Sequence, residues 1–525
     1  MNRDSGFLII GMYCIGILFL FGCVTPAWAD VTNHSFPGVQ SSYVALIPSH
    51  TGDDYSFTGN YENGQITIIS PGGYYLTHNL TTASADYAIQ IDAPDVTLDG
   101  YEMFLTGPGN SGIGVNIVSN GSYAVITNFS SVSGFFRGVY SEGKNVTISD
   151  SIVHDNSATG ISSHGDYSAI IGNIVYNQSD VGIHSQGNYS TITENYASYN
   201  RNGILSQGNY AVVSGNAGND NANYGIYAGG LYVGPEPGNE GIGYYAQIID
   251  NVALLNAVGG IKSALPHAII QDNSVFQNIE NGIALTWRSN NTTITGNYVS
   301  DNPTGINLSD RALNVSIIQN LIRSGGNSGI YVISENGKGS GEIFDNIFSG
   351  QQYVNGNGKM GAFSWTNPAG PIKGTNIMDG PFIAGNYWTN SNHTGWSDQQ
   401  PININGYSTT PFKVATGVYD TAPLVKVKAT PTPTPTPTPI PLAVNFTASP
   451  MSGVPPLTVQ FTDRSTGSPS AWRWNFGDGT YSTLMNPLHE YKGIGRYTIT
   501  LEVRKGDASA IMRKPEYVKT SRPMR

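Results

Sequence analysis

Two pairs of residues in the first third of the chain have the types and spacing that acid–base chemistry needs. His154 is followed directly by Asp155, and His164 is followed two residues later by Asp166. An imidazole beside a carboxylate can move protons near neutral pH. Enzymes that cleave sugar chains need clustered carboxylates, whereas the aspartates of this region are scattered over turns. We therefore expect solvated turn residues here, with an acid/base cluster as the alternative.

Tyrosines recur at one point of a repeated five-residue turn. Ser163-His-Gly-Asp-Tyr167, Ser185-Gln-Gly-Asn-Tyr189 and Ser206-Gln-Gly-Asn-Tyr210 follow the same pattern. Flat aromatic rings bind sugars by apolar contact, while amides and imidazole supply hydrogen bonds. The predicted binding residues are Tyr167, Tyr189, Tyr210, His164, Gln186, Gln207, Asp166, Asn188 and Asn209. The alternative, that stacked tyrosines only stabilise their own turn, stays open.

These turns belong to a repeat of about 22 residues that runs from about Tyr123 to Phe348. Each repeat holds short β-branched runs broken by Gly, Asn, Asp and Ser, without the apolar stripe of a helix. One column is apolar, and its members are Ile148, Ile170, Ile192 and Val213. A second column is asparagine, with members Asn173, Asn195, Asn216, Asn251, Asn273, Asn297, Asn320 and Asn346. A third is Gly followed by a β-branched residue, as in Gly160-Ile161 and Gly182-Ile183.

A fixed period of this kind predicts a solenoid of short strands, that is, a right-handed parallel β-helix in an all-β chain. Successive coils should lie one strand spacing apart, about 4.8 Å. The isoleucines should stack inside, and the asparagine amides should hydrogen-bond along the stack at a bend. We expect the glycines to supply a turn with positive φ.

The repeats resemble right-handed β-helices of the NosD-like type, also described as carbohydrate-binding and sugar-hydrolysis domains of the pectin-lyase-like class. The resemblance covers residues 62–424, and Gly385-Asn-Tyr-Trp388 and Asp420-Thr-Ala-Pro-Leu424 resemble the closing segment of that family. It implies the fold, while the family mixes enzymes, binders and proteins without an assigned role. We therefore expect a non-enzymatic binding protein and assign no catalytic residue; a polysaccharide lyase or hydrolase is the alternative.

A copper-handling accessory protein is the third hypothesis, which the resemblance alone suggests. Copper needs soft or closely spaced ligands, and here the methionines are dispersed and the nearest histidines are His154, His164 and His184. The aspartate-rich, calcium-like stretch of the family is replaced by Asn403-Ile-Asn-Gly406, which has no carboxylate. We therefore predict no metal site and no cofactor, and calcium stays open without a motif to hold it.

The first 29 residues have the pattern of a signal peptide: Arg3, an apolar stretch from Phe7 to Val24, and the cleavage sequence Ala27-Trp-Ala29. The alternative is a lipobox-like Leu20-Phe-Gly-Cys23, which would leave a lipidated cysteine. Both cysteines lie in this segment, so the mature chain would hold no thiol. No later stretch is long and apolar enough to span a bilayer. The formal net charge of −11 argues against a nucleic-acid partner.

A Thr-Pro repeat between Thr430 and Pro439 predicts a stiff, extended spacer. After it, Trp474-Asn-Phe-Gly-Asp-Gly479, Asn486-Pro-Leu-His-Glu-Tyr491 and the strand Gly495–Val503 resemble a PKD domain. That resemblance implies a small immunoglobulin-like β-sandwich with Trp474 packed between its sheets. The predicted boundaries are 1–29 signal peptide, 30–94 N-terminal cap and first coils, 95–350 β-helix repeats, 351–424 end of the β-helix region, 425–442 linker and 443–521 PKD domain.

Together these features predict a secreted or cell-surface protein. Its β-helix would present a long face to polysaccharides or to neighbouring surface glycoproteins.

Overall fold

The computed structural model describes residues 44–45, 61–62, 65–83, 86–229, 244–286, 288–309, 312–332, 339–356, 360–427, 442–467, 469–505 and 508–521. The predicted signal peptide, most of the Thr-Pro linker and residues 231–241, which are rich in proline and glycine, lie outside the described residues. Contacts divide the chain into two compact units, Met1–Lys428 and Ala429–Arg525. Among the described residues, no helix is long and apolar enough to cross a lipid bilayer.

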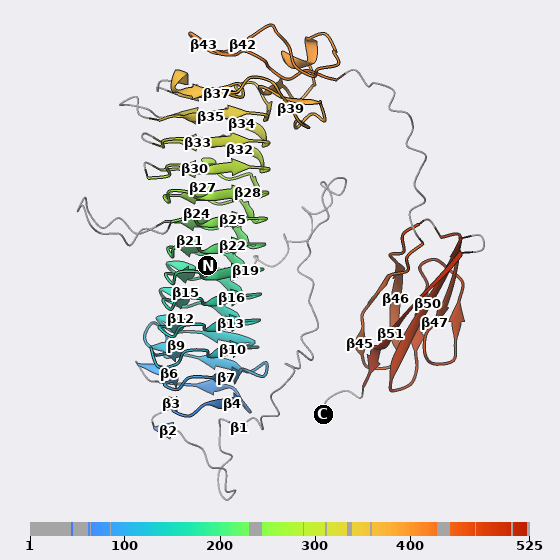
Figure 1. Cartoon of the computed structure of the whole chain (residues 1–525). Helices are drawn as coiled ribbons and strands as arrows, with labels where there is room; N and C mark the ends of the chain where they lie inside the picture. Colours follow the sequence, from blue (N-terminus) through green and yellow to red (C-terminus); the bar gives the residue numbers. More distant parts are fainter. Residues whose placement is uncertain are drawn as a thin grey trace, which may run out of the picture. The chain divides into compact units, whose positions relative to one another are not determined.

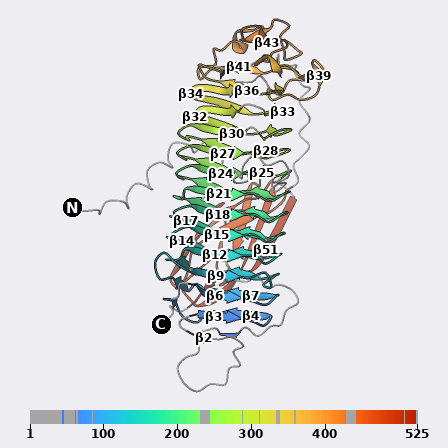
Figure 2. The same ribbon diagram turned by 90° about the vertical axis from the view of Figure 1, so that its left-hand side faces the viewer.

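The first unit is a stack of short parallel strands, coil upon coil (Figures 1 and 2). One sheet takes a single strand from each coil, and 14 of its strands are described. They are β1 (Val44–Ala45), β4 (Gly72–Tyr75), β7 (Val96–Asp99), β10 (Val125–Thr127), β13 (Thr147–Ser149), β16 (Ala169–Ile171), β19 (Thr191–Thr193), β22 (Val212–Ser214), β25 (Gln247–Ile249), β28 (Ile269–Gln271), β31 (Thr293–Thr295), β33 (Val315–Ile318), β35 (Gly341–Phe344) and β38 (Phe363–Ser364).

The second sheet takes two strands from each coil, a short one and a longer one. The short ones are β5 (Leu80–Thr81), β8 (Phe104–Thr106), β11 (Ser131–Ser133), β14 (Ile152–His154), β17 (Ile174–Tyr176), β20 (Tyr196–Ser198), β23 (Ala217–Asn219), β26 (Val252–Leu254), β29 (Ser274–Phe276), β36 (Ile347–Ser349) and β41 (Tyr387–Thr389). The longer ones are β3 (Gln65–Ile68), β6 (Tyr87–Ile91), β9 (Ile113–Ile117), β12 (Arg137–Ser141), β15 (Thr159–Ser163), β18 (Val181–Ser185), β21 (Asn202–Ser206), β24 (Tyr224–Ala228), β27 (Gly259–Ser263), β30 (Asn281–Leu285) and β37 (Val354–Gly356). In two coils both are joined into one strand, β32 (Tyr298–Leu308) and β34 (Leu321–Val332).

The predicted apolar column is confirmed. Ile148 pairs with Ile170, Ile170 with Ile192, and Ile192 with Val213, always on parallel neighbouring strands. All four side chains are fully buried. Since inward and outward positions alternate along a strand, the flanking residues of each three-residue strand point outward. The right-handed parallel β-helix is therefore the architecture of this unit.

The predicted asparagine ladder is also confirmed. The backbone N–H of Asn173 donates to Asn195 Oδ1 at 2.9 Å, and that of Asn195 donates to Asn216 Oδ1 at 2.9 Å. The ladder crosses the 35-residue coil between Asn216 and Asn251 without a break. A second ladder, five residues further along each coil, was not predicted. It joins Asn156, Gln178, Asn200, Asn221, Asn256, Asn278 and Asn302.

The role expected for the glycines before the β-branched residues was wrong. These glycines lie in strands such as β18 and β21, and they are not among the residues with positive φ. A Cβ on Gly182 would come within 2.6 Å of the Gly203 carbonyl oxygen and 2.7 Å of Asn200 Nδ2. These glycines thus leave room for the backbone of the adjacent coil and for the side chains of the second ladder, and they do not form a turn.

Both ends of the β-helix have additional segments. At the N-terminal end, β1 pairs with β4, and the antiparallel β2 (Tyr61–Glu62) pairs with β3. At the other end the coil register continues beyond Gly350, because β36 still pairs with β41. The closing segment adds η1 (Met360–Ala362), β39 (Ile372–Lys373), β40 (Phe382–Ile383), η2 (Ser397–Gln399), β42 (Phe412–Ala415) and β43 (Val418–Asp420).

The second unit is a two-sheet β-sandwich, as the PKD resemblance implied. One sheet holds β44 (Phe446–Ser449), β46 (Leu457–Asp463) and β49 (Leu488–Tyr491). The other holds β45 (Ser452–Gly453), β51 (Ala508–Thr520), β50 (Gly495–Lys505), β47 (Ala471–Asn475) and β48 (Tyr481–Ser482). Trp474 is fully buried in its core and donates from Nε1 to the Leu484 carbonyl oxygen at 2.9 Å, which confirms the predicted packing.

Candidate binding face

The outward positions of the longer strands, with the residues that follow them, bring histidine, tyrosine, arginine and lysine side chains onto one surface. The residue after each inward Ile or Val of these strands points away from the core. Register places Tyr140, Ser162, His184, Leu205, Tyr227 and Lys262 in one column on successive strands from β12 to β27. We call this surface the histidine face and define it by Arg137, Tyr140, Glu142, Ser162, His164, His184, Gln186, Gln207, Tyr224, Tyr227 and Lys262.

The lower half of the histidine face is a row of aromatic rings in edge contact. The ring centroids of Tyr140 and His164 lie 5.1 Å apart, and those of His164 and His184 lie 5.9 Å apart. His184 Nε2 lies 2.8 Å from Gln207 Oε1, and His164 Nε2 lies 3.1 Å from the Ser162 hydroxyl. The two imidazoles are therefore held in place by hydrogen bonds as well as by each other.

Burial keeps this row uncharged. Desolvation lowers the pKa of His184, and desolvation followed by the nearby His184 and Arg137 lowers the pKa of His164. Desolvation, assisted by a hydrogen bond to Glu142, raises the pKa of Tyr140. At neutral pH the face thus carries neutral imidazoles, which can accept a proton, beside a neutral phenol, which can donate one.

The upper half of the histidine face holds a lysine over two aromatic rings. Lys262 Nζ lies 4.8 Å from the ring centroid of Tyr224 and 4.6 Å from that of Tyr227. Desolvation lowers the pKa of Lys262 and raises that of both tyrosines. No acidic side chain among the described residues forms an ion pair with this ammonium group. Lys262 is thus a half-buried cation with no ion-pair partner among the described residues.

The predicted tyrosines form a separate feature at the turn that follows the longer strands. The rings of Tyr167 and Tyr189 are stacked with centroids 5.0 Å apart, and so are those of Tyr189 and Tyr210. The stack continues through Tyr245 to His267, and these five residues are the tyrosine stack. Each inner ring is covered on both broad faces by its neighbours, so a sugar would meet ring edges and hydroxyl groups there. Sugar binding by the tyrosine stack stays a prediction.

Replacing Tyr167, Tyr189 and Tyr210 together by alanine should lower the free energy of unfolding by about 2–3 kcal/mol, because three stacked ring pairs are lost. The effect is measured as a shift of the midpoint of urea unfolding. If the stack only stabilises its turn, binding of any polysaccharide to the folded variant is unchanged. Loss of binding by a folded variant would show instead that the stack is a contact surface.

The other predicted binding residues divide between two surfaces. Asn188 donates from its backbone N–H and its Nδ2 to Asp166 Oδ1, both at 3.0 Å, and Asn209 donates likewise to Asn188 Oδ1. These three side chains form a third ladder along the turn, which uses their amides internally. His164, Gln186 and Gln207 lie instead on the histidine face, in contact with Tyr140 and His184.

The two predicted acid/base pairs also differ. Asp166 lies in the turn ladder and 3.6 Å from Lys144 Nζ, while the ring contacts of His164 are with Tyr140 and His184. His154 Nδ1, in contrast, lies 2.7 Å from Asp155 Oδ2. Among the described residues, only the His154–Asp155 pair is therefore joined by a hydrogen bond.

Sequence reasoning missed Arg137, Tyr140, Tyr224, Tyr227 and Lys262. For Tyr140, Tyr227 and Lys262 the signal was available, because each directly follows a Gly-Ile or Gly-Val pair, as in Gly225-Ile-Tyr227. Since the β-branched residue points inward, its successor must point outward. The residue types of that column vary from coil to coil, and for that reason it does not stand out as a repeat.

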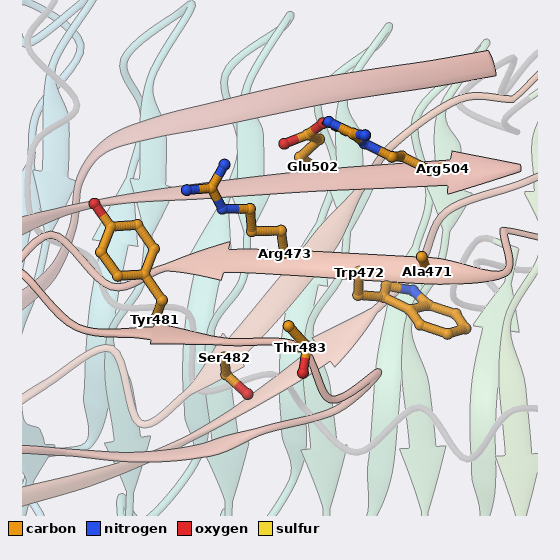
Figure 3. Close-up of a pocket in the computed structure, with 8 residues that line it drawn as sticks. All are labelled: Ala471, Trp472, Arg473, Tyr481, Ser482, Thr483, Glu502 and Arg504. Carbon is orange, nitrogen blue, oxygen red and sulfur yellow. Dashed lines mark hydrogen bonds and ion pairs between the residues drawn. The ribbon is translucent and has the colours of Figure 1, made fainter. Parts of the chain in front are cut away.

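The PKD domain has a hollow of about 590 Å³ on one sheet, lined by Ala471, Trp472, Arg473, Tyr481, Ser482, Thr483, Glu502 and Arg504 (Figure 3). Arg504 Nε donates to Glu502 Oε1 at 2.7 Å, so these two charged groups pair with each other. The Arg473 guanidinium lies 5.5 Å from the Tyr481 ring centroid.

Three protein families match parts of the chain. Residues 228–395 match the periplasmic copper-binding protein (NosD) family, and residues 137–299 match the right-handed beta helix region family. Residues 437–518 match the PKD domain family. The collagenase ColA of Bacillus cereus is 42 % identical over 59 residues, which is 10 % of this chain and 6 % of the collagenase. The chain thus spans a small fraction of that relative's length.

Solved structures of low sequence identity are also similar. A double mutant of the periplasmic alginate epimerase AlgG aligns at 12 % identity and a TM-score of 0.35, over 61 % of this chain and 82 % of the epimerase. The A-module of the mannuronan C-5 epimerase of Azotobacter vinelandii aligns at 16 % identity and a TM-score of 0.30, over 60 % and 84 %. A pectate lyase aligns at 14 % identity and a TM-score of 0.21, over 62 % and 70 %.

The residues that the structure describes do not fit the copper that the NosD description names. They contain no group of three His, Cys, Asp or Glu side chains placed to hold a metal ion. His164 and His184 are near each other, but the Nε2 atom of each is engaged by Ser162 or Gln207. His154 bonds to other residues, Ser131 and Asp155.

The strand register, the two ladders and the family matches agree on one architecture for the two units. The first unit is a right-handed parallel β-helix, parts of which match the NosD and right-handed beta helix families, and it is followed by a PKD domain.

Proposed function

We propose that the β-helix binds a carboxylate-bearing polysaccharide along the histidine face. The observation that carries the proposal is Lys262, a half-buried ammonium group over two tyrosine rings with no acidic partner among the described residues. A desolvated cation without a counter-charge is costly. A bound carboxylate would offset that cost, and the rings of Tyr224 and Tyr227 would limit the approach of water.

A second cation of the same kind lies at the other end of the face. The Arg137 guanidinium lies 4.8 Å from the ring centroid of Tyr140 and forms no ion pair with a described acidic residue. Its strand β12 is five strands below β27, which carries Lys262, so the two cations are about 24 Å apart along the stack. Two carboxylate sites at that separation fit a chain-like anion better than a compact one.

The groups between the cations suit sugar hydroxyls. His164, His184, Gln186 and Gln207 are uncharged donors and acceptors of hydrogen bonds, spread over three successive turns. Polar groups of this kind orient a ligand, while aromatic surface supplies apolar contact. We infer further that the protein acts outside the cytoplasm, which the apolar N-terminal segment, the PKD domain and the periplasmic NosD match support.

Replacing Lys262 and Arg137 by alanine should weaken binding of polygalacturonate about tenfold for each cation, because each substitution removes one charge-assisted contact. Isothermal titration calorimetry at two ionic strengths measures the change, and the salt dependence should decrease with each substitution. Lys144→Ala is the matched control, since Lys144 is an exposed lysine on the turn surface that pairs with Asp166. Parent-like affinity of the double variant, or equal binding of an uncharged glucan, would contradict the proposal.

A polysaccharide lyase is the second candidate, which the contact of Tyr140, His164 and His184 favours. β-Elimination next to a uronate carboxylate needs a cation on that carboxylate, a base for the α-proton and an acid for the leaving oxygen. Arg137, a neutral imidazole and the Tyr140 phenol are the groups that would take these roles.

The two candidates differ in the fate of the ligand. Under the lyase candidate, polygalacturonate or alginate incubated with the protein gains ultraviolet absorbance from unsaturated chain ends. His164→Ala and His184→Ala should abolish that gain while binding persists. Tight binding by the parent protein without any unsaturated product would support the binding function and contradict the lyase candidate.

A further inference from the structure

A second constellation lies outside the histidine face, on the outward side of the short strands β11 and β14. His154 Nε2 lies 2.9 Å from Ser131 Oγ, and His154 Nδ1 lies 2.7 Å from Asp155 Oδ2. A carboxylate is only an acceptor of hydrogen bonds, so the imidazole proton must be on Nδ1. Nε2 is then a lone-pair acceptor that faces the serine hydroxyl, which is the arrangement that activates a serine nucleophile.

The imidazole is held firmly in this orientation. The ring of Tyr176 on the next strand stacks on His154, with centroids 5.0 Å apart and an angle of 3° between the planes. Asp155 is fixed in turn by Asn177, whose Nδ2 donates to its second carboxylate oxygen at 3.1 Å. Each member therefore has a supporting partner, which a chance surface contact would not require.

We propose that Ser131, His154 and Asp155 form an ester-cleaving site for small acyl groups, such as the O-acetyl groups carried by polysaccharide hydroxyls. Ser131 is only 9 % exposed, so a bulky acyl group would not reach its hydroxyl. Phe104 pairs with Ser131 in register and is 48 % exposed, which places apolar surface beside the nucleophile for an acyl methyl group. The Ser133 hydroxyl, 3.3 Å from Ser131 Oγ, is placed to donate to the developing oxyanion.

The reaction needs no cofactor. Ser131 Oγ attacks the ester carbonyl carbon while its proton passes to His154 Nε2, and the carbonyl oxygen takes the negative charge. Collapse of this intermediate breaks the bond to the alcohol oxygen, which leaves with the proton from His154. Water then attacks the acyl-serine, its proton passes to His154, and the carboxylic acid departs as Ser131 recovers the proton. Ester and water are converted to acid and alcohol, so atoms and electrons balance.

The experiment uses the full-length protein and a fluorophosphonate probe, with p-nitrophenyl acetate as substrate. We expect one covalent label, mapped to Ser131, and acetate release that Ser131→Ala abolishes. His154→Ala should slow both by roughly 10²-fold, the usual contribution of a general base. Ser149→Ala is the matched control, because Ser149 on β13 bonds only to Thr127 and its backbone neighbours and should leave labelling unchanged.

Asp155 is a positioning residue, since it contacts His154 and not the substrate. Asp155→Asn should lower kcat for p-nitrophenyl acetate and leave KM unchanged. If Asp155 had only a structural role, the substitution would change the melting temperature and leave the ratio of kcat to KM unchanged. If Ser131→Ala fails to fold, the near-isosteric Ser131→Cys replaces it, and its thiol should react with iodoacetamide at least about tenfold faster than that of Ser149→Cys. Absence of a label on the parent protein, labelling that persists in Ser131→Ala, or equal thiol rates would overturn the proposal.

Discussion

Replacing Asn195 by leucine is expected to lower the free energy of unfolding of the β-helix by about 5 kcal/mol. The Asn195 side chain is 2 % exposed and serves the coils on both sides. Its Oδ1 accepts from the backbone N–H and the Nδ2 of Asn173, at 2.9 and 3.0 Å. Its Nδ2 donates to the carbonyl oxygens of Ile170 and Thr193, at 2.8 and 2.9 Å.

Leucine has nearly the same volume, but it leaves several of these buried donors and acceptors without partners, and each such group costs about 1–3 kcal/mol. Urea unfolding followed by circular dichroism measures the loss. Asn116→Leu is the matched control, because Asn116 is an outward, half-buried residue whose side-chain donor bonds only to Gln90. We expect the control to lose less than about 1 kcal/mol. Similar losses for both variants would mean that the ladder does not contribute more than an ordinary surface bond.

The ladder could be predicted from sequence because one residue type performs one task in every coil. Ile170 and Ile192 occupy the same inward position of successive coils, and Asn173, Asn195 and Asn216 make the same hydrogen bonds at the bend. Because each position needs one residue type in every coil, a period is visible in the sequence. The second ladder keeps the same spacing, and Gln178 in place of asparagine conceals it. Its period was nonetheless present in the sequence.

The outward surfaces could not be predicted in the same way. Neighbouring outward residues contact each other with different chemistry, as Tyr140 contacts His164 through ring edges and Lys262 contacts Tyr227 through its charge. No residue type repeats, so no period appears. The contact of Ser131 with His154 joins residues 23 positions apart on adjacent coils, and it becomes visible only when the strand register is known.

The positions where the backbone adopts the left-handed conformation could not be predicted from the sequence either. Tyr167, Tyr189 and Tyr210 have φ between 56° and 60°, a conformation that β-branched and bulky residues rarely adopt. Glycine was expected to fill such positions, but the glycines before the inward Ile are needed where adjacent coils approach closely. The stacked rings add favourable contacts at these same positions.

The asparagine ladder ends on a carboxylate, and replacing that carboxylate is the second change with a large expected effect. Asn346 donates to Asn386 Oδ1, and the Asn386 backbone N–H donates to Asp420 Oδ2 at 2.8 Å. Asp420 is fully buried and also accepts from Trp388 Nε1 at 2.9 Å and from the Thr366 hydroxyl at 2.9 Å. Asp420 thus terminates the ladder and joins it to the closing segment.

Asp420→Ala should lower the free energy of unfolding by about 4 kcal/mol, since three buried donors lose their acceptor and a small cavity is left. Hydrogen exchange should show the loss first in β41 and β43, the strands nearest the carboxylate. Asp379→Ala is a suitable control, because Asp379 is an exposed aspartate of the same segment whose side chain makes no hydrogen bond among the described residues. A variant that exchanges as slowly as the parent would show that the ladder needs no terminal acceptor.

The same carboxylate makes the loss depend on pH. Burial raises the pKa of Asp420 to about 6 in the folded protein, above its ordinary value of 3.8. Between these two values the folded state binds more protons than the unfolded state, so the stability that Asp420 contributes falls as the pH rises. The difference in unfolding free energy between the parent and Asp420→Ala should therefore be largest near pH 4 and shrink toward pH 7. Burial also raises the pKa of Asp345 to about 6, but both proteins contain Asp345, so its effect cancels in the difference. A difference that grows with pH would show that the hydrogen-bond donors around Asp420 outweigh the effect of its burial.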